Sequence, residues 1–325
     1  MKVLVTGGTG FFGVALLEWL AERRSQAESN EITILSRHPE QFMARHGDLC
    51  HRSGVTFLKG DVLDKKSLLG GEGYSHILHA ATESTFGPRL SPSERFGQIV
   101  EGTKNVLEVA REVRAKRFLL ASSGGVYGRA EKECPIKETE RLGLDVTDPE
   151  MAYCVGKVAA EHMTAIACRE SGISYTIARC FSFLGPHLPR DVHFAVGNFI
   201  KAALEGRDIR IVGDGLAVRS YMYESDWAEW LWCLTVRGRS GEIYNVGSQE
   251  AITILDLARM VREVSKRKIT VQVLGRDKSG ARDFYVPCIG KAIKEMGLSV
   301  RVSLKEGLER TFLREREGWA ARLLR

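Results

Sequence analysis

The stretch that decides the fold lies near the N-terminus and reads Thr6-Gly7-Gly8-Thr9-Gly10-Phe11-Phe12-Gly13. It stands between an apolar segment that predicts a strand, residues 2–6, and a segment that predicts a helix, residues 15–24. Gly7, Gly10 and Gly13 are spaced three residues apart. This spacing permits a tight turn, close approach of the backbone to a pyrophosphate, and close packing of the helix on the strand. The first turn of the helix would point free N–H groups at the phosphates, so the stretch predicts a dinucleotide site.

The segments that follow alternate between predicted strands and predicted helices up to about residue 180. The strands are continuously apolar, as expected when a parallel sheet is covered by helices on both faces. We therefore predict an α/β fold with a doubly wound parallel (Rossmann) sheet and a smaller C-terminal α/β substrate lobe. The expected strands of the first half are residues 2–6, 31–36, 56–59, 76–79, 117–121 and 175–179, and the expected helices are 15–24, 100–113 and 149–170.

The alternation breaks after a Gly-Pro turn at residues 185–186. We expect the dinucleotide-binding domain to cover residues 1–180, with residues 219–248 returning to it. The substrate-binding lobe would comprise residues 181–218 and 249–325. Beyond the turn, the expected helices are 198–204, 226–234, 254–265 and 303–322, and the expected strands are 209–212, 243–246 and 270–273.

Composition narrows the class of protein. With 325 residues, 44% of them hydrophobic and 27% charged, the chain can bury a large core. Its net charge of 47 − 41 = +6 suits an anionic small molecule better than a nucleic acid. No apolar run reaches the ~18 residues of a membrane span. Seven cysteines without a Cys-x-x-Cys pair, and no leader segment, favour reduced thiols and a cytoplasmic location.

The type of dinucleotide depends on the end of the second predicted strand. That strand ends in Ser36-Arg37, where an acidic residue would favour NAD. A serine and an arginine fork suit a 2′-phosphate, so NADP is favoured over NAD, although Arg37 could also be a solvated surface charge. Asp61, followed by Val62, would accept a hydrogen bond from the adenine amino group. Further cofactor contacts are expected from Phe11, Phe12, Ala80, Ala81 and Thr82.

Three residues of the middle region predict proton chemistry. Tyr153 and Lys157 stand four residues apart, on one face of a predicted helix. A nearby ammonium would lower the tyrosine pKa from its usual ~10 and let the phenol exchange a proton with a substrate alcohol or carbonyl. Lys157 could also hold the cofactor ribose. Ser123 ends the fifth predicted strand, where its hydroxyl could donate to the reacting oxygen.

Taken together, these motifs resemble the extended short-chain dehydrogenases/reductases, in the NAD-dependent epimerase/dehydratase (nucleotide-sugar) family. The resemblance implies an enzyme that acts at C4 of the hexose of a nucleoside-diphosphate sugar, and a homodimer formed through two long helices. It implies Tyr153 as acid/base, Lys157 as its electrostatic and ribose partner, and Ser123 as the group that orients the sugar oxygen. Substrate contacts implied by the resemblance are Ser123, Ser182, Asn198, Arg219 and Arg282. Besides the residues above, it rests on residues 61–62, on Tyr127, on residues 179–186 and on residues 213–219.

Departures from the family pattern narrow the activity. Sugar 4,6-dehydratases of this family carry an Asp-Glu pair after the serine, and Gly124-Gly125 stand there instead. Ile99 and Ser182 stand where the family often has asparagine. Residues 178–223 are most similar to CDP-abequose synthase-like 4-ketoreductases, so we predict a 4-ketoreductase. The alternatives are a C4 epimerase with tightly bound NAD, an atypical dehydratase, and a non-catalytic dinucleotide-sensing protein.

The sequence predicts no metal site and no membrane or nucleic-acid partner. His187 and His193 are the histidines that stand in the predicted substrate lobe. We expect no metal-ligand cluster around either of them.

Overall fold

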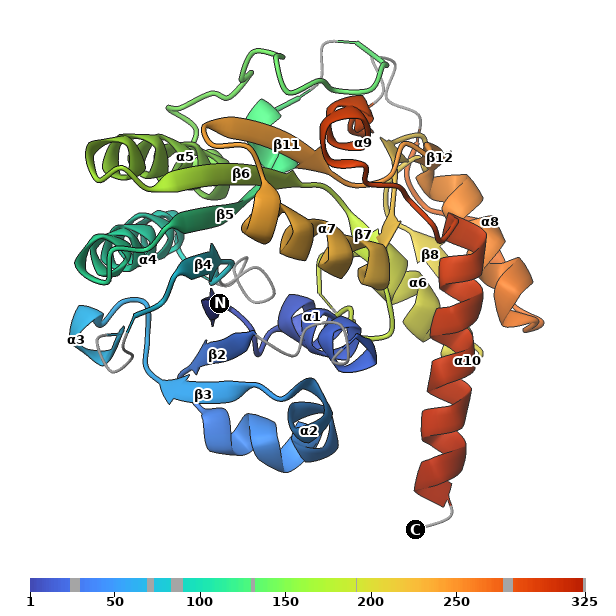
Figure 1. The fold of residues 1–325 in the computed structure, drawn as a ribbon. Coiled ribbons are helices and arrows are strands. Elements are labelled where there is room, and N and C mark those ends of the chain that lie inside the picture. The colour runs from blue at the N-terminus through green and yellow to red at the C-terminus, as the bar shows by residue number, and fades with distance from the viewer. Residues whose placement is uncertain are drawn as a thin grey trace.

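The computed structural model describes residues 1–23, 30–68, 73–82, 90–129, 132–190, 192–276 and 283–323. Its centre is a seven-stranded sheet with the order β11-β6-β5-β4-β1-β2-β3, in which every neighbouring pair is parallel (Figure 1). The strand order reverses between β1 and β4, and such a reversal is where doubly wound sheets bind ligands. The strands are β1 (Lys2–Thr6), β2 (Glu31–Ser36), β3 (Thr56–Lys59), β4 (His76–His79), β5 (Arg117–Ser123), β6 (Ser174–Cys180) and β11 (Glu242–Val246).

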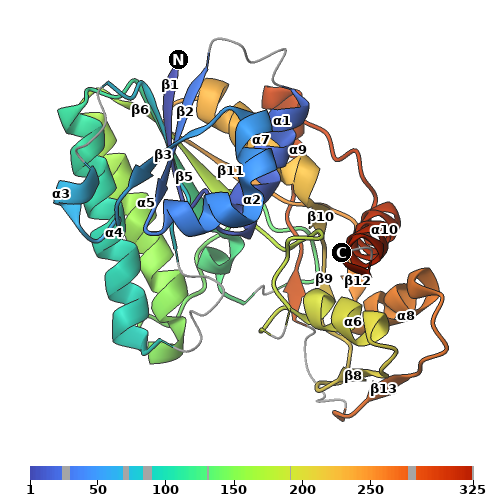
Figure 2. The ribbon, with the colours of Figure 1, turned by 90° about the horizontal axis from the view of Figure 1, so that it is seen from below.

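Helices cover both faces of this sheet, as Figure 2 shows. Strand β1 explains the continuous apolar pattern: Val3 and Val5 belong to the core on one face, and Leu4 to the core on the other. The predicted fold class is confirmed. One face carries α1 (Phe11–Glu22), α2 (Pro39–Ser53), α7 (Glu224–Arg237) and α9 (Gly290–Met296), and the other carries α3 (Lys65–Leu68), α4 (Pro92–Glu112) and α5 (Ala152–Glu170).

A smaller lobe lies beyond the carboxyl ends of the strands, and it has its own hydrophobic core. Its helices are α6 (Ala195–Leu204), α8 (Ile254–Ser265) and α10 (Leu304–Leu323). Its short strands form three small sheets: β8 (Ile209–Ile211) with β13 (Val271–Val273), β7 (Phe183–Leu184) with β10 (Met222–Tyr223), and β9 (Val218–Arg219) between β12 (Ile252–Thr253) and β14 (Phe284–Tyr285). No helix in the described part of the chain is both long and apolar enough to cross a membrane.

Several elements differ from the sequence prediction. Helix α4 begins at Pro92 instead of residue 100, because Ser91 and Glu94 form a capping box ahead of it. Helix α2 was not predicted, and its backbone is non-helical at His46. We propose that the chain divides into the predicted dinucleotide-binding domain and substrate-binding lobe, with one change to their boundaries. The segment around α9 joins the first part, because Ala292 and Met296 pack in the core of the large sheet.

Candidate active site

The glycine loop between β1 and α1 forms an anion cradle. Gly7 has a φ of +79°, and a Cβ there would lie 2.7 Å from the backbone carbonyl of Ala80. A Cβ on Gly13 would overlap the backbone of Gly8, so helix α1 can approach the loop closely only with glycine at this position. The N-cap of α1 is Gly10, which offers no side chain to the first N–H groups. These groups therefore stay available to bind a phosphate.

A cavity of about 320 Å³ opens in front of this loop. It lies at the carboxyl ends of β1, β2 and β4, where the residues expected to bind the cofactor come together. The expected residues that line it are Gly7, Gly10, Phe11, Phe12, Ser36, Arg37, Asp61, Val62, Ala80, Ala81 and Thr82, and sequence reasoning missed Thr9, Leu35, Gly60, Leu63 and Gln98.

The end of β2 presents a cation and no carboxylate to this cavity. Ser36 is buried, and its Oγ accepts the backbone N–H of His38 at 3.2 Å. The exposed Arg37 forms no ion pair with any residue in the described part of the chain. Asp61 accepts the backbone N–H of Leu63 at 3.0 Å, which fixes its carboxylate at the rim. The residues thus fit a dinucleotide and leave a guanidinium free at its ribose end.

The predicted catalytic residues meet in a second cavity of about 670 Å³. Ser123 lies at the end of β5, where it accepts the N–H of Gly125 at 3.0 Å and caps a 3₁₀ turn (Gly124–Tyr127). Its hydroxyl also hydrogen-bonds the phenol of Tyr153, which lies on α5 together with Lys157. The two cavities adjoin, because Phe11, Phe12, Ala80 and Thr82 line both.

The protonation of this group differs from the sequence prediction. Burial raises the pKa of Tyr153 to about 12, a rise that the hydrogen bond with Ser123 only partly offsets. Burial also lowers the pKa of Lys157 to about 8. The expected lowering of the tyrosine pKa by the ammonium is therefore wrong. Lys157 Nζ donates at 2.9 Å both to Thr82 Oγ1 and to the carbonyl of Ala121, and it lies 5.9 Å from the centroid of the tyrosine ring.

A second phenol reaches the same point, and the sequence analysis missed it. Tyr285 of β14 hydrogen-bonds Ser123, and burial raises its pKa. Its hydroxyl occupies the space in front of Gly124, where a Cβ would lie 2.6 Å from Tyr285 Oη and 2.7 Å from Phe181 Cε2. The glycine that replaces the acid of the dehydratase pattern thus makes room for a phenol. No sequence signal links these positions, because the small lobe carries Tyr285 to the site.

The other expected substrate contacts divide into three groups. Ser182 and Arg219 line the 670 Å³ cavity, and Arg219 is held there by an ion pair with Asp283. Asn198 does not line it, since its amide donates to the carbonyl of Val192 at 2.8 Å. Arg282 lies outside the described residues. The polar residues of the wall that were not among the expected contacts are Arg95, Ser122, Glu150, Cys154, Cys180, His193, Tyr221 and Tyr285.

Comparison with known proteins now identifies the family. The model of the NAD dependent epimerase/dehydratase family matches residues 3–247. The chain belongs to this family. The resemblance drawn from the motifs, and with it the assignment to an enzyme class, the extended short-chain dehydrogenases/reductases, is confirmed.

Three relatives span nearly the whole chain. UDP-glucuronic acid decarboxylase 1 of Arabidopsis thaliana is 30% identical over 313 residues, which cover 95% of this chain and 68% of the relative. DesIV, a dTDP-glucose 4,6-dehydratase of Streptomyces venezuelae solved with NAD, is 26% identical with a TM-score of 0.82, and 98% of each chain is covered. The epimerase Mth375 of Methanothermobacter thermautotrophicus is 26% identical with a TM-score of 0.82, over 98% of this chain and 93% of its own.

A buried ion pair holds helix α5 against the sheet of this family member. Glu161 of α5 pairs with Arg179 of β6 at 2.7 Å, with both side chains less than a tenth exposed. Ser122 Oγ donates to the same carboxylate at 2.5 Å. Because Ser122 precedes Ser123, and Glu161 lies one turn beyond Lys157, this pair positions the catalytic strand and helix relative to each other.

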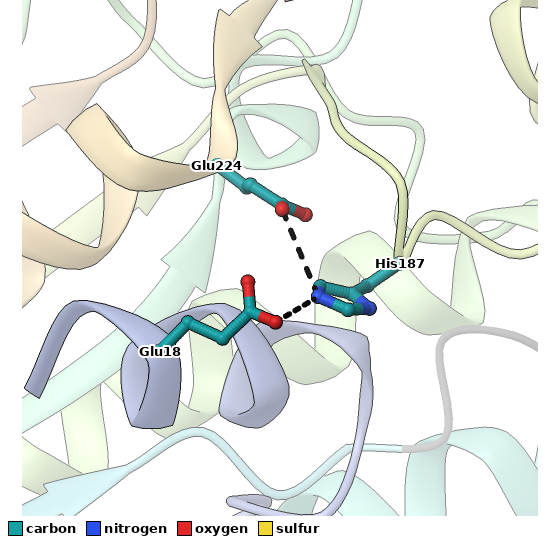
Figure 3. Close-up of side chains that lie close together, drawn as sticks. All are labelled: Glu18, His187 and Glu224. Carbon is teal, nitrogen blue, oxygen red and sulfur yellow. Dashed lines mark ion pairs between the residues drawn. The ribbon is translucent and has the colours of Figure 1, made fainter. Parts of the chain in front are cut away.

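A separate cluster corrects one premise of the sequence analysis. His187 was expected to lack ligating neighbours, and this is wrong. Glu18 of α1 and Glu224 of α7 both point at its imidazole (Figure 3). Neither of the two main cavities is lined by any of the three residues.

Proposed function

We propose that the protein is an NAD(P)-dependent oxidoreductase that acts at C4 of the hexose of a nucleoside-diphosphate sugar, as a 4-ketoreductase. The observation that carries this proposal is the placement of Tyr153 beside Ser123 in the 670 Å³ cavity, next to two glycines where an eliminating enzyme needs carboxylates. The 670 Å³ cavity, which would hold the sugar, adjoins the 320 Å³ cavity, which would hold the dinucleotide.

The raised pKa of Tyr153 supports a role for this residue as the proton donor of a ketone reduction. In the reduction of a 4-keto sugar, a reduced dinucleotide held at the glycine loop would supply the hydride for C4, and the oxygen at C4 would need a proton from the protein. A phenol whose pKa is about 12 is protonated at neutral pH and is ready to donate that proton. Ser123 would hold the same oxygen by a hydrogen bond. Oxidation of a C4 alcohol would require the phenolate, which burial disfavours here.

Elimination of water is poorly supported. It requires an acid and a base beside C5 and C6, and Gly124-Gly125 supply neither. Within the described part of the chain, the only carboxylate on the cavity wall belongs to Glu150, which is exposed. A non-catalytic dinucleotide sensor is also poorly supported, since it would have no need for Ser123, Tyr153 and a buried Lys157 to converge.

Two further activities have a specific observation in their favour. The relative that is 30% identical is a UDP-glucuronic acid decarboxylase, and one solved relative at 26% identity is an epimerase. Decarboxylation of a uronic acid and epimerisation at C4 both begin with oxidation at C4, so they would need the same tyrosine as a base. The substrate panel below therefore includes a uronic acid.

We propose NADPH as the working cofactor. The support is Ser36 together with Arg37, which forms no ion pair with any other described residue, at the ribose end of the 320 Å³ cavity, where a 2′-phosphate would be. Helices α4 and α5 would form the homodimer interface. They expose Phe96 and Ile166, large apolar side chains that association would cover.

The test is a substrate panel with the purified full chain. NADPH and NADH consumption would be followed with UDP- and dTDP-4-keto-6-deoxyhexoses, UDP-glucose and UDP-glucuronic acid. We expect NADPH to be consumed with a 4-keto sugar, and Tyr153→Phe to lower kcat by about 10²–10⁴-fold. Tyr175→Phe, which removes a buried phenol from β6 outside the cavity, is the matched control and should be silent.

Each other outcome contradicts the proposal in a recognisable way. Tightly bound NAD, with a C4 epimer formed and no net NADPH consumption, would identify an epimerase. Release of CO₂ from UDP-glucuronic acid would identify a decarboxylase. Turnover that Tyr153→Phe leaves unchanged would remove the catalytic assignment altogether.

A further inference from the structure

Three potential metal ligands meet where the two parts of the molecule adjoin. Glu18 lies on α1, Glu224 is the first residue of α7, and His187 lies in the turn after β7. Figure 3 shows both carboxylates directed at one edge of the imidazole. His187 Nε2 is 3.0 Å from Glu18 Oε1 and 3.8 Å from Glu224 Oε1.

Glu224 is buried, while Glu18 and His187 each expose a little under a fifth of their side chains, and the hydrogen bonding of the cluster is incomplete. Nε2 of His187 is buried and has no hydrogen-bond partner of acceptable geometry among the described residues. Glu224 is 8% exposed and accepts the backbone N–H of His187. The space for its carboxylate exists because residue 185 is a glycine, since a Cβ there would overlap it. A buried imidazole nitrogen and a buried carboxylate thus face each other without a donor that satisfies both.

The charges of the cluster do not balance. Arg314 of α10 pairs with Glu18. Burial alone would raise the pKa of that carboxyl, but the neighbouring His187 and Arg314 together lower it to about 2. No lysine or arginine of the described residues forms an ion pair with Glu224. Among the described residues, the carboxylates of Glu18 and Glu224 thus have one guanidinium beside them, that of Arg314. A buried carboxylate of this kind is normally protonated, paired or bound to a metal.

We propose that Glu18, His187 and Glu224 form a binding site for a divalent transition-metal ion of the Zn²⁺ class. All three ligand atoms lie within 4.8 Å of one another. Because Zn–N and Zn–O bonds are about 2.0–2.2 Å long, ligands of one ion lie roughly 3–4 Å apart. One imidazole with two carboxylates suits Zn²⁺ better than Mg²⁺ or Ca²⁺, which prefer oxygen ligands alone.

The position of the site indicates a structural role. Helix α1 begins at the glycine loop, α7 covers the large sheet, and His187 belongs to the turn that leads into the small lobe. An ion bound by all three would fasten the helix of the cofactor loop to that turn. The proposal is independent of the reaction proposed above, because none of the three residues lines the catalytic cavity.

The test uses full-length protein that has been stripped with a chelator and then titrated with Zn²⁺ by calorimetry, at constant pH. Co²⁺ serves as a second probe, because its visible spectrum reports an imidazole-carboxylate environment. We expect one Zn²⁺ per chain and a higher Tm when it is bound. His187→Ala and Glu224→Gln should each weaken binding by at least about 100-fold, since loss of an outer-shell partner alone costs about 10–100-fold.

His162→Ala removes an exposed histidine of α5 and is the matched control, which should bind Zn²⁺ as the wild type does. If His187→Ala does not fold, His187→Gln and the Co²⁺ spectrum of the wild type replace it. The proposal is overturned if the wild type binds no stoichiometric Zn²⁺, or if Glu224→Gln binds it unchanged. A Tm that varies with pH but does not change when Zn²⁺ is added would likewise overturn it. In that case a proton, and not a metal ion, would compensate the negative charge of the carboxylates.

Discussion

Replacing Gly124 by alanine tests the link between this glycine and the second phenol of the site. The added Cβ would lie 2.6 Å from Tyr285 Oη and 2.7 and 2.8 Å from two ring carbons of Phe181. Such distances are well inside van der Waals contact, so a neighbour must move. Phe181 is 3% exposed and packs on the Tyr285 ring at 4.5 Å between centroids, which leaves it little room. The strain should therefore displace Tyr285.

General values give the size of the loss of stability and activity expected for Gly124→Ala. Overpacking by one methyl group typically destabilises a core by about 1–3 kcal/mol. In a protein of this size, each kcal/mol lowers Tm by roughly 2–4 °C or less. A shift of about 1 Å in a group at the reacting centre can cost on the order of 10²-fold in rate. We expect a Tm lower by a few degrees together with a larger proportional loss of kcat/KM.

The assay is thermal unfolding combined with steady-state kinetics on the substrate found in the panel. Gly97→Ala is the control, because a Cβ on this helical glycine meets nothing within 4 Å and should raise stability slightly. Gly124→Ala combined with Tyr285→Phe removes one of the close contacts and should recover part of the Tm, but not the activity. A Gly124→Ala variant with wild-type Tm and kcat/KM would refute the reasoning.

Two further predictions concern buried charges. Burial lowers the pKa of Lys157 from 10.5 to about 8, so the unfolded state binds more protons between these values, and stability should rise with pH across that window. Urea denaturation should show that the free energy of unfolding of the wild type, relative to that of Lys157→Met, increases by about 3 kcal/mol between pH 8 and 10.5. If the difference between the two proteins does not change with pH, the prediction is wrong. Glu161→Gln leaves Arg179 buried and unpaired, and should cost about 3–5 kcal/mol of unfolding free energy. The exposed Glu101→Gln should cost less than about 1 kcal/mol, and equal losses would show that burial does not matter.

The parts of the molecule that could be predicted are those that depend on patterns of residues close together in the sequence. The glycine spacing and the apolar strands determine the large sheet, because each strand must be covered on both faces by neighbours in sequence. The residues of the predicted cofactor site could be grouped for a related reason, because the carboxyl ends of parallel strands meet at one edge of the sheet. Ser36, Asp61 and Ala80 each end or follow a strand, and all three line one cavity.

What could not be predicted depends on segments that meet only in the folded chain. Tyr285 reaches Ser123 because the small lobe places β14 over the end of β5, and Asn198 misses the cavity because its amide satisfies a backbone carbonyl nearby. His187 looked isolated because its two carboxylate neighbours come from α1 and α7. Contacts between segments that are distant in the sequence produce no periodic pattern from which they could be predicted.

The tyrosine pKa shows a further limit of prediction, because the sequence argument for Tyr153 and Lys157 left out the effect of burial. Spacing on a helix predicts that Tyr153 and Lys157 are neighbours, and they are, but it says nothing of where the ammonium points or how much water remains. Lys157 donates to Thr82 and to a backbone carbonyl, while burial penalises both charged forms. Burial thus raises the pKa of the Tyr153 phenol, which favours the form that donates a proton. An enzyme of this family that oxidises C4 first would need the phenolate, so it would have to offset this effect of burial. A titration of Tyr153 would therefore help to separate the two kinds of enzyme, which the motif alone does not.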